Sequence, residues 1–280
     1  MAKLKWHETG EKFYETGIKD VVLYVYDETI DKYIAVPEGT SAPEFVSGKY
    51  YEKSGSAEPY TYNVLTEEPA NWATTYTTYY IENPTEYGDG VAWNGVTSLS
   101  ETPSGGEASD LYADDDKYLS LYSEEQLGAS LEAYTYPDEW GVCDGSAEVG
   151  EGLQLSQQSR KMFALAYITT VGDDVIGNDK GEKLHLLYGC KASPSDRSYA
   201  TINDSPEAIT FSWELTTTKQ ETGDTNLKKT ALLTIDTTKL TGGKENATYV
   251  ALKGMIQGTD STDPYIPKVK EVVAMFKGNG

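Results

Sequence analysis

The sequence is short of the side chains that enzymes use most often for catalysis and metal binding. Its 280 residues include two histidines, His7 and His185, and two cysteines, Cys143 and Cys190. A nucleophilic triad needs a histidine beside a serine or cysteine, and a zinc site needs clustered cysteine and histidine ligands. His7 lies in a polar terminus and His185 alternates with leucines (KLHLLY), so we expect both histidines to be structural.

Other catalytic and metal-binding patterns are missing too. The chain has no G-x-S-x-G elbow, P-loop or dinucleotide-binding fingerprint. The acidic clusters at residues 114–116 and 173–179 lack EF-hand spacing, and we expect them to be solvated loops. A glycosidase that uses two carboxylates stays open, because a fold can bring together any two of the 45 acidic residues. The sequence thus favours a non-enzyme without cofactor or metal.

Basic side chains are also scarce. The chain has 23 lysines and arginines against 45 aspartates and glutamates, which gives a net charge of −22. Ordinary DNA binding needs basic contacts to phosphates, so this balance argues against it. Solubility is the simplest interpretation of the charge, but an acidic wall would also repel a DNA duplex and let it slide past.

Long apolar runs are lacking as well. No apolar stretch follows Met1, so we expect neither a secretory signal nor a membrane span. We therefore expect the protein to be made and kept in a cytoplasm, where thiols such as those of Cys143 and Cys190 stay reduced.

Short alternating apolar segments and 22 tyrosines are what the chain has instead, and both are typical of β-sheets. Residues 18–26 (IKDVVLYVY) are apolar on both faces, which predicts a strand buried on both sides. Residues 117–122 (KYLSLY) and 130–136 (SLEAYTY) alternate, which predicts half-buried strands. Further strands are expected at residues 160–170, 183–188, 208–218 and 230–235. Asn94-Gly95 predicts a turn between two short strands, and residues 103–106 predict a break in the chain's regular structure.

Helical patterns are confined to short stretches. Residues 138–145 predict one helical turn, with Asp138 as its cap and Gly145 as its stop. Residues 246–256 and 268–276 predict two C-terminal helices, separated by Pro264 and Pro267. In the second of these helices, apolar residues recur at helical spacing: Val269, Val272, Val273 and Phe276.

Residues 31–87 differ from the rest and hold nine of the 22 tyrosines and five of the 11 prolines. Pro43 is followed seven residues later by Tyr50-Tyr51, and Pro69 is followed ten residues later by Tyr79-Tyr80, which is a loose match. This pattern is either a chance similarity or a duplication of a small hairpin whose second strand carries the double tyrosine. The whole pattern predicts a mainly β protein, an antiparallel sandwich or barrel with a short helix, a C-terminal helical segment and a tyrosine-rich insertion.

Three long phrases carry a family resemblance: YADDDKYLSLYS (residues 112–123), EAYTYPDEW (residues 132–140) and SYATINDSPEAITFSWE (residues 198–214). With them, residues 4–28 and 88–277 resemble the major tail protein, or tail tube protein, of long-tailed phages of Gram-positive bacteria. Residues 31–87 depart from that family, whose members run almost directly from the first strand to a turn like GVAWNG.

The resemblance implies a structural virion protein with a β-sandwich fold and no catalytic residues. It implies hexameric rings that stack into a hollow tube through which DNA passes into the host. Tape measure, tail terminator and baseplate proteins are the implied partners, and assembly would occur in the host cytoplasm. We divide the chain into a discontinuous tube domain, residues 1–30 and 88–280, and an insertion, residues 31–87, which we place outside the tube because inward copies would block DNA.

Two sets of residues are candidates for roles in such a tube. Asp114, Asp115 and Asp116 are expected to face the channel, where acidic side chains would not hold phosphate. The C-terminal helix carrying Val269, Val272, Val273 and Phe276 either reaches a neighbouring subunit or packs on its own sandwich. A carbohydrate-binding or adhesive surface protein, built on the tyrosine-rich insertion, is the alternative function.

Overall fold

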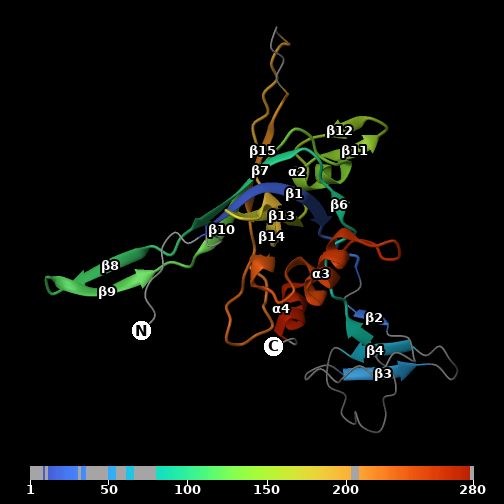
Figure 1. Cartoon of the computed structure of the whole chain (residues 1–280). Helices are drawn as coiled ribbons and strands as arrows, with labels where there is room; N and C mark the ends of the chain where they lie inside the picture. Colours follow the sequence, from blue (N-terminus) through green and yellow to red (C-terminus); the bar gives the residue numbers. More distant parts are fainter. Residues whose placement is uncertain are drawn as a thin grey trace. The chain divides into compact units, whose positions relative to one another are not determined.

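The computed structural model describes residues 9, 12–30, 33–35, 50–54, 61–65, 80–202 and 208–277, with the backbone alone at 33–35, 50–54, 61–65 and 80–82. The chain divides into two compact units, Met1–Tyr26 with Tyr87–Gly280, and Asp27–Glu86. The second unit covers nearly the same residues as the insertion expected from the sequence. Figure 1 labels most of the strands and helices of both units.

The first unit is built on an antiparallel sheet with the strand order β6-β1-β13-β14-β15-β10-β7, in which β16 also pairs with β14. Its strands are β1 (Phe13–Val25), β6 (Val91–Ala92), β7 (Val96–Ser104), β10 (Gln126–Ala133), β13 (Phe163–Asp173), β14 (Gly177–Ala192), β15 (Phe211–Thr216) and β16 (Leu232–Asp236). The prediction of a mainly β fold with antiparallel sheets is confirmed, and the expected strands at 160–170, 183–188, 208–218 and 230–235 correspond to β13 to β16.

The long strand β14 divides this sheet into two halves. Residues 183–187 pair with β16 while the same stretch pairs with β13 on its other side. The last residues, Lys191 and Ala192, pair with β15 instead. The two halves, β6-β1-β13-β14-β16 and β15-β10-β7, both contribute side chains to one shared core.

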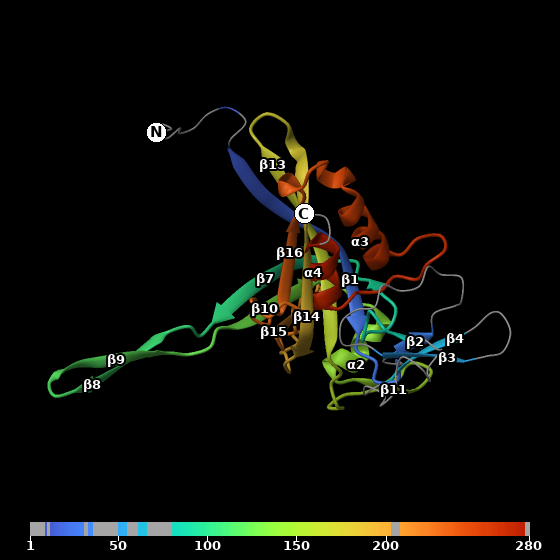
Figure 2. The same cartoon turned by 90° about the horizontal axis from the view of Figure 1, so that it is seen from below.

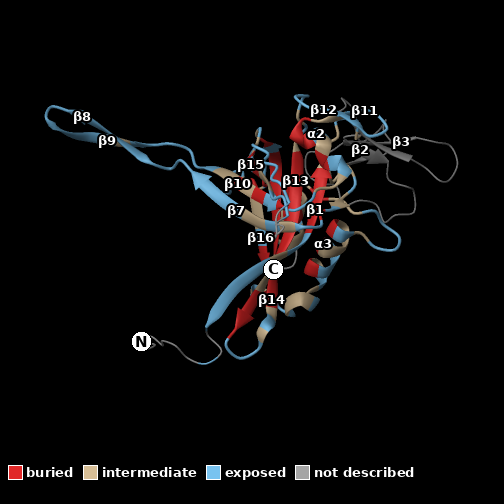
Figure 3. Cartoon of the chain, turned by 90° about the horizontal axis from the view of Figure 1, so that it is seen from above, coloured by how far each residue is buried: buried red, intermediate tan, exposed pale blue. Residues whose placement is uncertain are grey.

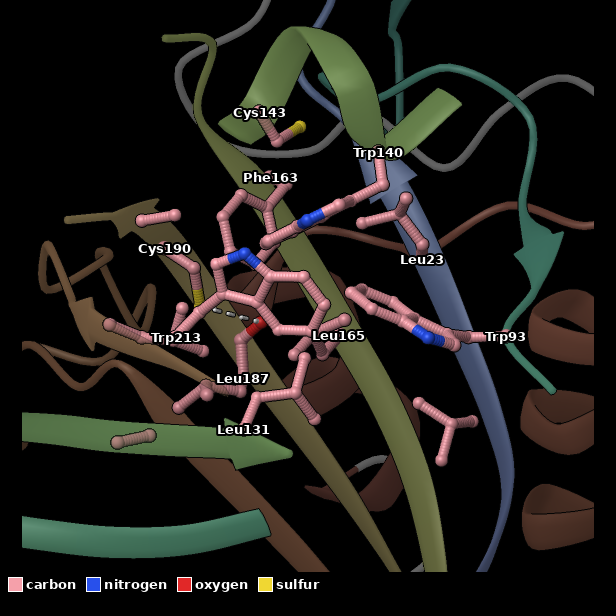
Figure 4. Close-up of a cluster of buried hydrophobic side chains, with 14 of the residues drawn as sticks. Leu23, Trp93, Leu131, Trp140, Cys143, Phe163, Leu165, Leu187, Cys190 and Trp213 are labelled. Carbon is pink, nitrogen blue, oxygen red and sulfur yellow. Dashed lines mark hydrogen bonds between the residues drawn. The ribbon is translucent and has the colours of Figure 1, made fainter. Parts of the chain in front are cut away.

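Aromatic side chains fill the core between the two halves (Figure 4). The ring centroids of Trp140 lie 4.7 Å from Trp93, 5.2 Å from Trp213 and 4.9 Å from Phe163. Trp93 also donates a hydrogen bond from Nε1 to the carbonyl oxygen of Thr135, at 2.8 Å. Trp140 comes from a short helix, η1 (Asp138–Trp140), so this helix is held in place by the core it completes.

A second core lies on the opposite face of the β1-β13-β14 layer. It is closed by the two C-terminal helices, α3 (Ala247–Gln257) and α4 (Val269–Lys277), which Figure 2 shows beside these strands. Tyr249, Leu252 and Ile256 of α3 and Val269 and Val272 of α4 are buried there. Both helices were expected from their apolar spacing, and the segment between them contains Pro264 and Pro267 as expected.

The strand predicted to be buried on both faces is confirmed in β1. Val21 and Leu23 belong to the core between the sheets, while Val22 and Tyr24 belong to the core under the helices. Tyr24 donates a hydrogen bond from its hydroxyl to the carbonyl oxygen of Ile256, at 2.5 Å, and this bond joins the strand to the end of α3. The alternation of side chains along one strand thus serves two cores at once.

The expected helical turn at residues 138–145 is present, with one correction. It consists of η1 followed by α2 (Gly141–Asp144), and Gly145 ends it in the left-handed conformation, with φ 80°. Asp138 is not the cap as expected, because the cap position belongs to Pro137 and no side chain bonds there.

Asn94-Gly95 forms the predicted turn between two short strands, β6 and β7, which pair with β1 and β10 and not with each other. The break expected at residues 103–106 is confirmed only in its second half. It falls at residues 105–107, because β7 continues through Pro103, which is opposite Leu127, to Ser104. Since β10 is the one described strand that pairs with β7, Pro103 lies on a sheet edge, where its missing N–H is tolerated.

Four small two-stranded sheets complete the described part. One is a hairpin of β8 (Ala108–Ala113) and β9 (Asp116–Tyr122), and another joins β11 (Ala147–Gly150) to β12 (Leu153–Leu155); neither pair was expected as a hairpin. In the second unit, β3 (Tyr50–Ser54) pairs with β4 (Thr61–Leu65).

Of the two interpretations of the double-tyrosine pattern, the structure contradicts the duplication of a small hairpin. Tyr50-Tyr51 lies in the first strand of its hairpin, not the second. The strand that contains Tyr80, β5 (Tyr80–Glu82), pairs with the distant β2 (Tyr33–Ala35). The side chains of these tyrosines lie outside the described residues, and so does any sugar-binding surface that they would form.

A buried carboxylate joins α3 to the sheet. Glu182 of β14 accepts hydrogen bonds from the Tyr249 hydroxyl at 2.7 Å and from Lys253 Nζ at 2.6 Å, and Lys19 Nζ lies 3.4 Å away. Burial by itself would raise the pKa of Glu182, but the bonds from Lys253 and Tyr249 and the charge of Lys19 outweigh it and lower the pKa to about 2.

The core between the sheets is expected to dominate the stability of the first unit. Leu131→Ala removes a fully buried side chain and should lower the free energy of unfolding by about 2–5 kcal/mol. Leu121→Ala, the same change at a residue that is 53% exposed, should alter it by less than about 0.5 kcal/mol. Chemical denaturation of both variants measures the difference, and equal losses would contradict this assignment of the core.

The lowered pKa of Glu182 predicts a specific pH dependence. A carboxyl whose pKa is lower in the folded state stabilises the fold above its unfolded pKa, and that contribution is lost as pH falls. The stability difference between the wild type and Glu182→Gln should therefore be largest near pH 7 and shrink between about pH 4.5 and about pH 2. Denaturant midpoints of both proteins across this range test it, and a constant difference would contradict it.

Candidate assembly surface

The β8–β9 hairpin, residues 108–122, projects from the first unit as an arm (Figure 1). Its strands pair from Ala108 opposite Tyr122 to Ala113 opposite Asp116. Asp114 and Asp115 form the two-residue turn at the tip, both with positive φ, 52° and 60°. Two consecutive positive φ values are typical of a type I′ hairpin turn, in which aspartate is tolerated. The acidic cluster expected as a solvated loop is therefore a hairpin turn.

The arm exposes an unusual amount of apolar surface for two strands. Figure 3 shows it exposed along its length. Six large apolar or aromatic side chains on it are between 38% and 74% exposed: Leu111, Tyr112, Tyr118, Leu119, Leu121 and Tyr122. The prediction that residues 117–122 form a half-buried strand is right about the strand and wrong about its burial, because no second layer covers β8 and β9 in the described part of the chain.

The arm is acidic at its tip. It carries four aspartates and one lysine, a net charge of −3. Lys117 lies 2.8 Å from Asp110, so the lysine is already paired away from the tip. Asp114, Asp115 and Asp116 take part in no ion pair among the described residues, although Asp116 accepts a hydrogen bond from the backbone N–H of Lys117. Three carboxylates therefore stand at the end of an apolar ribbon.

A cavity of about 1130 Å³ lies at the root of the arm. We call it the root cavity. Its walls come from the arm base, from β7 and β10, and from the segment of residues 219–232 that leads into β16. Pro103, Leu127, Leu227 and Leu232 are among its apolar lining residues, and Leu227 is 52% exposed. The cavity is larger than the roughly 300–1,000 Å³ of ordinary small-molecule sites.

Three lysines line the root cavity, in a chain with few basic residues. Lys219 Nζ lies 2.6 Å from Glu124 at the arm base, and this hydrogen bond is the main reason why the pKa of Glu124 is lowered. Lys229 Nζ lies 2.6 Å from Glu221. Lys228 is exposed and has no ion-pair partner among the described residues. The charge of Lys228 also contributes to the lowered pKa of Glu124. The lining carries five carboxylates in all, so acidic side chains outnumber basic ones there: Glu101, Glu124, Glu125, Glu221 and Asp224.

The C-terminal helix uses its apolar residues within the chain. Val269 and Val272 are buried in the second core, and Val273 and Phe276 pack against it. The sequence left two interpretations of this helix open, contact with a neighbouring subunit or packing on its own sandwich. The burial of these residues corresponds to the second. Val273 also borders a second cavity of about 300 Å³ beside the segment of residues 222–225, so α4 lies next to the root cavity.

The histidine and cysteines singled out in the sequence lie inside the fold. His185 stacks on Tyr167 with ring centroids 4.6 Å apart, and its Nε2 lies 3.0 Å from Thr169 Oγ1. Burial lowers the pKa of His185, although Glu101 and Glu15 act in the opposite direction. Cys143 and Cys190 are free and buried, and burial raises the pKa of the Cys143 thiol to about 12. His7 lies outside the described residues.

The second acidic cluster, at residues 173–179, stabilises a turn. Asp173 Oδ1 accepts hydrogen bonds from the backbone N–H groups of Val175 and Ile176, and its Oδ2 lies 3.0 Å from Lys180 Nζ. Among the described residues, no group of three or more histidines, cysteines, aspartates and glutamates is placed to hold a metal ion. No helix in the described part is long and apolar enough to cross a membrane.

Sequence comparisons add no family to this description. The chain matches no known family model, and it matches none of the curated proteins.

The arm is expected to contribute little to folding, because a two-stranded ribbon without a covering layer buries little apolar surface. Ala108 and Tyr122 are opposite each other, so residues 109–121 can be replaced by Asn-Gly to give a shortened-arm variant with a tight turn. Its free energy of unfolding should match that of the wild type within about 0.5 kcal/mol in chemical denaturation. A loss like that expected for Leu131→Ala would show that the arm is part of the core.

Proposed function

We propose that this protein is a structural subunit that assembles with copies of itself into stacked hexameric rings. The rings would form the tail tube of a long-tailed phage, through which DNA is delivered. The exposed apolar arm is the observation that carries the proposal. It supports self-assembly directly, and the resemblance of residues 4–28 and 88–277 to major tail proteins supplies the kind of assembly.

The arm has the properties of a protein–protein contact surface. An isolated pair of strands is marginally stable in water, and contiguous exposed apolar side chains usually mark an interaction surface. The six exposed residues of the arm lie on one continuous ribbon that the rest of its chain leaves uncovered in the described part. A neighbouring subunit would bury this ribbon and stabilise its conformation.

The edges of the main sheet support the same conclusion. In the described part, β7 pairs with β10 alone and β16 pairs with β14 alone, so each has a free edge. Free edges pair with other chains unless they are protected, and a closed ring satisfies every edge in the same way. Sheets joined across subunits are what the tail tube resemblance implies for the wall of the channel.

The acidity suits a channel for DNA. At physiological salt, charges act over roughly 8 Å, so only acidic residues on the channel wall would repel phosphate. The tube proposal places the insertion, residues 31–87, on the outside, and it makes the tail terminator, tape measure and baseplate proteins the partners within a virion.

Negative-stain microscopy of the purified full chain tests the proposal. We expect rings or tubes with six-fold symmetry for the wild type, and monomers for the shortened-arm variant at the same concentration. Equal denaturation midpoints of the two proteins, at a dilution at which both sediment as monomers, would show that the loss of assembly is not a loss of folding. A wild type that stays monomeric in sedimentation at every concentration tested would contradict the proposal.

A further inference from the structure

The two faces of the arm differ in chemistry. Asp110 accepts a hydrogen bond from the Ser120 hydroxyl at 2.5 Å and lies 2.8 Å from Lys117 Nζ, so these polar side chains share one face. Side chains alternate along a strand, and the neighbouring cross-strand pair, Leu111 opposite Leu119, therefore points to the other face. The residues of that other face carry no charge, and we call it the leucine face: Ser109, Leu111, Leu119 and Leu121.

The tyrosines at the two ends of the arm lie on its polar face. Tyr112 is two residues from Asp110, and Tyr122 is two residues from Ser120, so all four side chains share that face. The two tyrosines are 70% and 74% exposed, and their hydroxyl groups can bond to water. The three leucines, which are 38–53% exposed, have no polar group of this kind. The leucine face therefore has more to gain from an apolar cover than the polar face has.

The β11–β12 hairpin carries a face of the same kind. Ala147 is opposite Leu155 on one face, and Glu148 belongs to the neighbouring pair on the other. Val149 follows Ala147 by two positions and Leu153 precedes Leu155 by two, so both extend the uncharged face. In the described part, β11 and β12 pair only with each other. We call this the second apolar face, and three of its four residues are 47–61% exposed: Ala147, Val149, Leu153 and Leu155.

The leucine face and the second apolar face match in size and in their lack of charge. Each is two strands wide and spans three residues along each strand, about 5 Å by about 7 Å between Cα atoms. Sheets pack face to face about 10 Å apart through interdigitating side chains. Charged residues are depleted at the centre of protein interfaces, and copies with a net charge of −22 repel each other. Two uncharged faces are therefore surfaces at which such copies can meet.

The two hairpins leave the main sheet at opposite ends of β10. The arm enters β10 at Gln126, whereas α2 and β11 follow its other end at Ala133. Eight residues of strand separate these ends by roughly 25 Å. Figure 1 and Figure 2 show the arm and β11 on opposite sides of the first unit. One copy therefore does not bring its own two apolar faces together.

We propose that the leucine face of one copy packs on the second apolar face of the next copy. This inference rests on the proposed function, because it names the surface that covers the assembling arm. Each copy then binds one neighbour with its arm and another with its β11–β12 hairpin, and such head-to-tail contacts close into a ring when the rotation between copies permits it. A stable interface has about 20–30 residues a side, so the free edges of β7 and β16 supply further contacts.

The first test compares the two faces of the arm in the full chain. Leu119→Ser with Leu121→Ser removes two side chains of the leucine face, and Tyr112→Ser with Tyr122→Ser is the matched control on the polar face. Neither change alters the net charge, and the control removes the more exposed pair. In sedimentation, we expect the leucine variant to need a protein concentration about tenfold higher than the wild type to form rings. The tyrosine variant should stay within about threefold of the wild type, and an effect as large as that of the leucine variant would overturn the assignment of the face.

A second test addresses the partner surface. Leu153→Ser with Leu155→Ser should raise the concentration needed for rings as much as the leucine variant of the arm does. Gln154→Ser is the matched control, because Gln154 lies between these leucines and is opposite Glu148 on the other face. Wild-type assembly of the Leu153→Ser, Leu155→Ser variant would overturn the β11–β12 hairpin as the partner surface. With a defective arm variant, that result would point to contact between the leucine faces of two arms.

Denaturation midpoints separate assembly from folding. All four variants should match the wild type at a dilution at which each sediments as a monomer, because they change exposed or partly exposed side chains. A wild type that forms no rings contradicts the proposed function itself. A wild type that forms rings, together with two leucine variants that assemble at the same concentration, overturns the contact proposed here and leaves the ring proposal standing.

Discussion

The antiparallel pairing of β13 with β14 is the constraint on which the rest of the first unit depends. Both strands are almost continuously buried, and each face of this pair supports a different core. The tryptophan cluster packs on one face and α3 and α4 pack on the other. Because β14 also passes from one half of the sheet to the other, its pairing sets where the two layers meet. A shift of this register by one residue would exchange the side chains of the two cores.

Polar contacts add orientation to this apolar framework. Glu182 lies between Tyr249, Lys253 and Lys19, so it fixes where α3 lies against the sheet. Tyr167 donates a hydrogen bond to Glu101, at 2.6 Å, and this contact joins β13 to β7 at the opposite side of the sandwich. Glu182 is buried, and a buried carboxylate is costly to leave unpaired, so its bonds favour one position of α3 on the sheet.

The arm contrasts with this framework because none of its large side chains belongs to either core. The residues that form the two cores are therefore separate from those that the arm exposes. Under the proposed function, substitutions in the arm change contacts between copies without changing either core.

Several features followed from local sequence patterns. Residues 18–26 are apolar on both faces of the predicted strand. Such a strand buries both faces only when it lies between two packed layers. The apolar spacing of residues 268–276 determined a helix with one buried face, and Gly145 determined where the short helix ends. These features depend on neighbours within a few residues, which is why the sequence was sufficient for them.

Tertiary structure decided what the same patterns could not. KYLSLY alternates as a core strand does, yet β9 is exposed because its one partner in the described part is β8 and no layer lies above the pair. Asp114 and Asp115 were visible as an acidic cluster, but the paired strands on both sides make them a turn at the end of an arm. The root cavity joins residues from 101 to 232, a distance along the chain that no local pattern spans. The amino-acid sequence by itself determined strands, helices and charge, whereas long-range pairing decided which surfaces stayed open for contact.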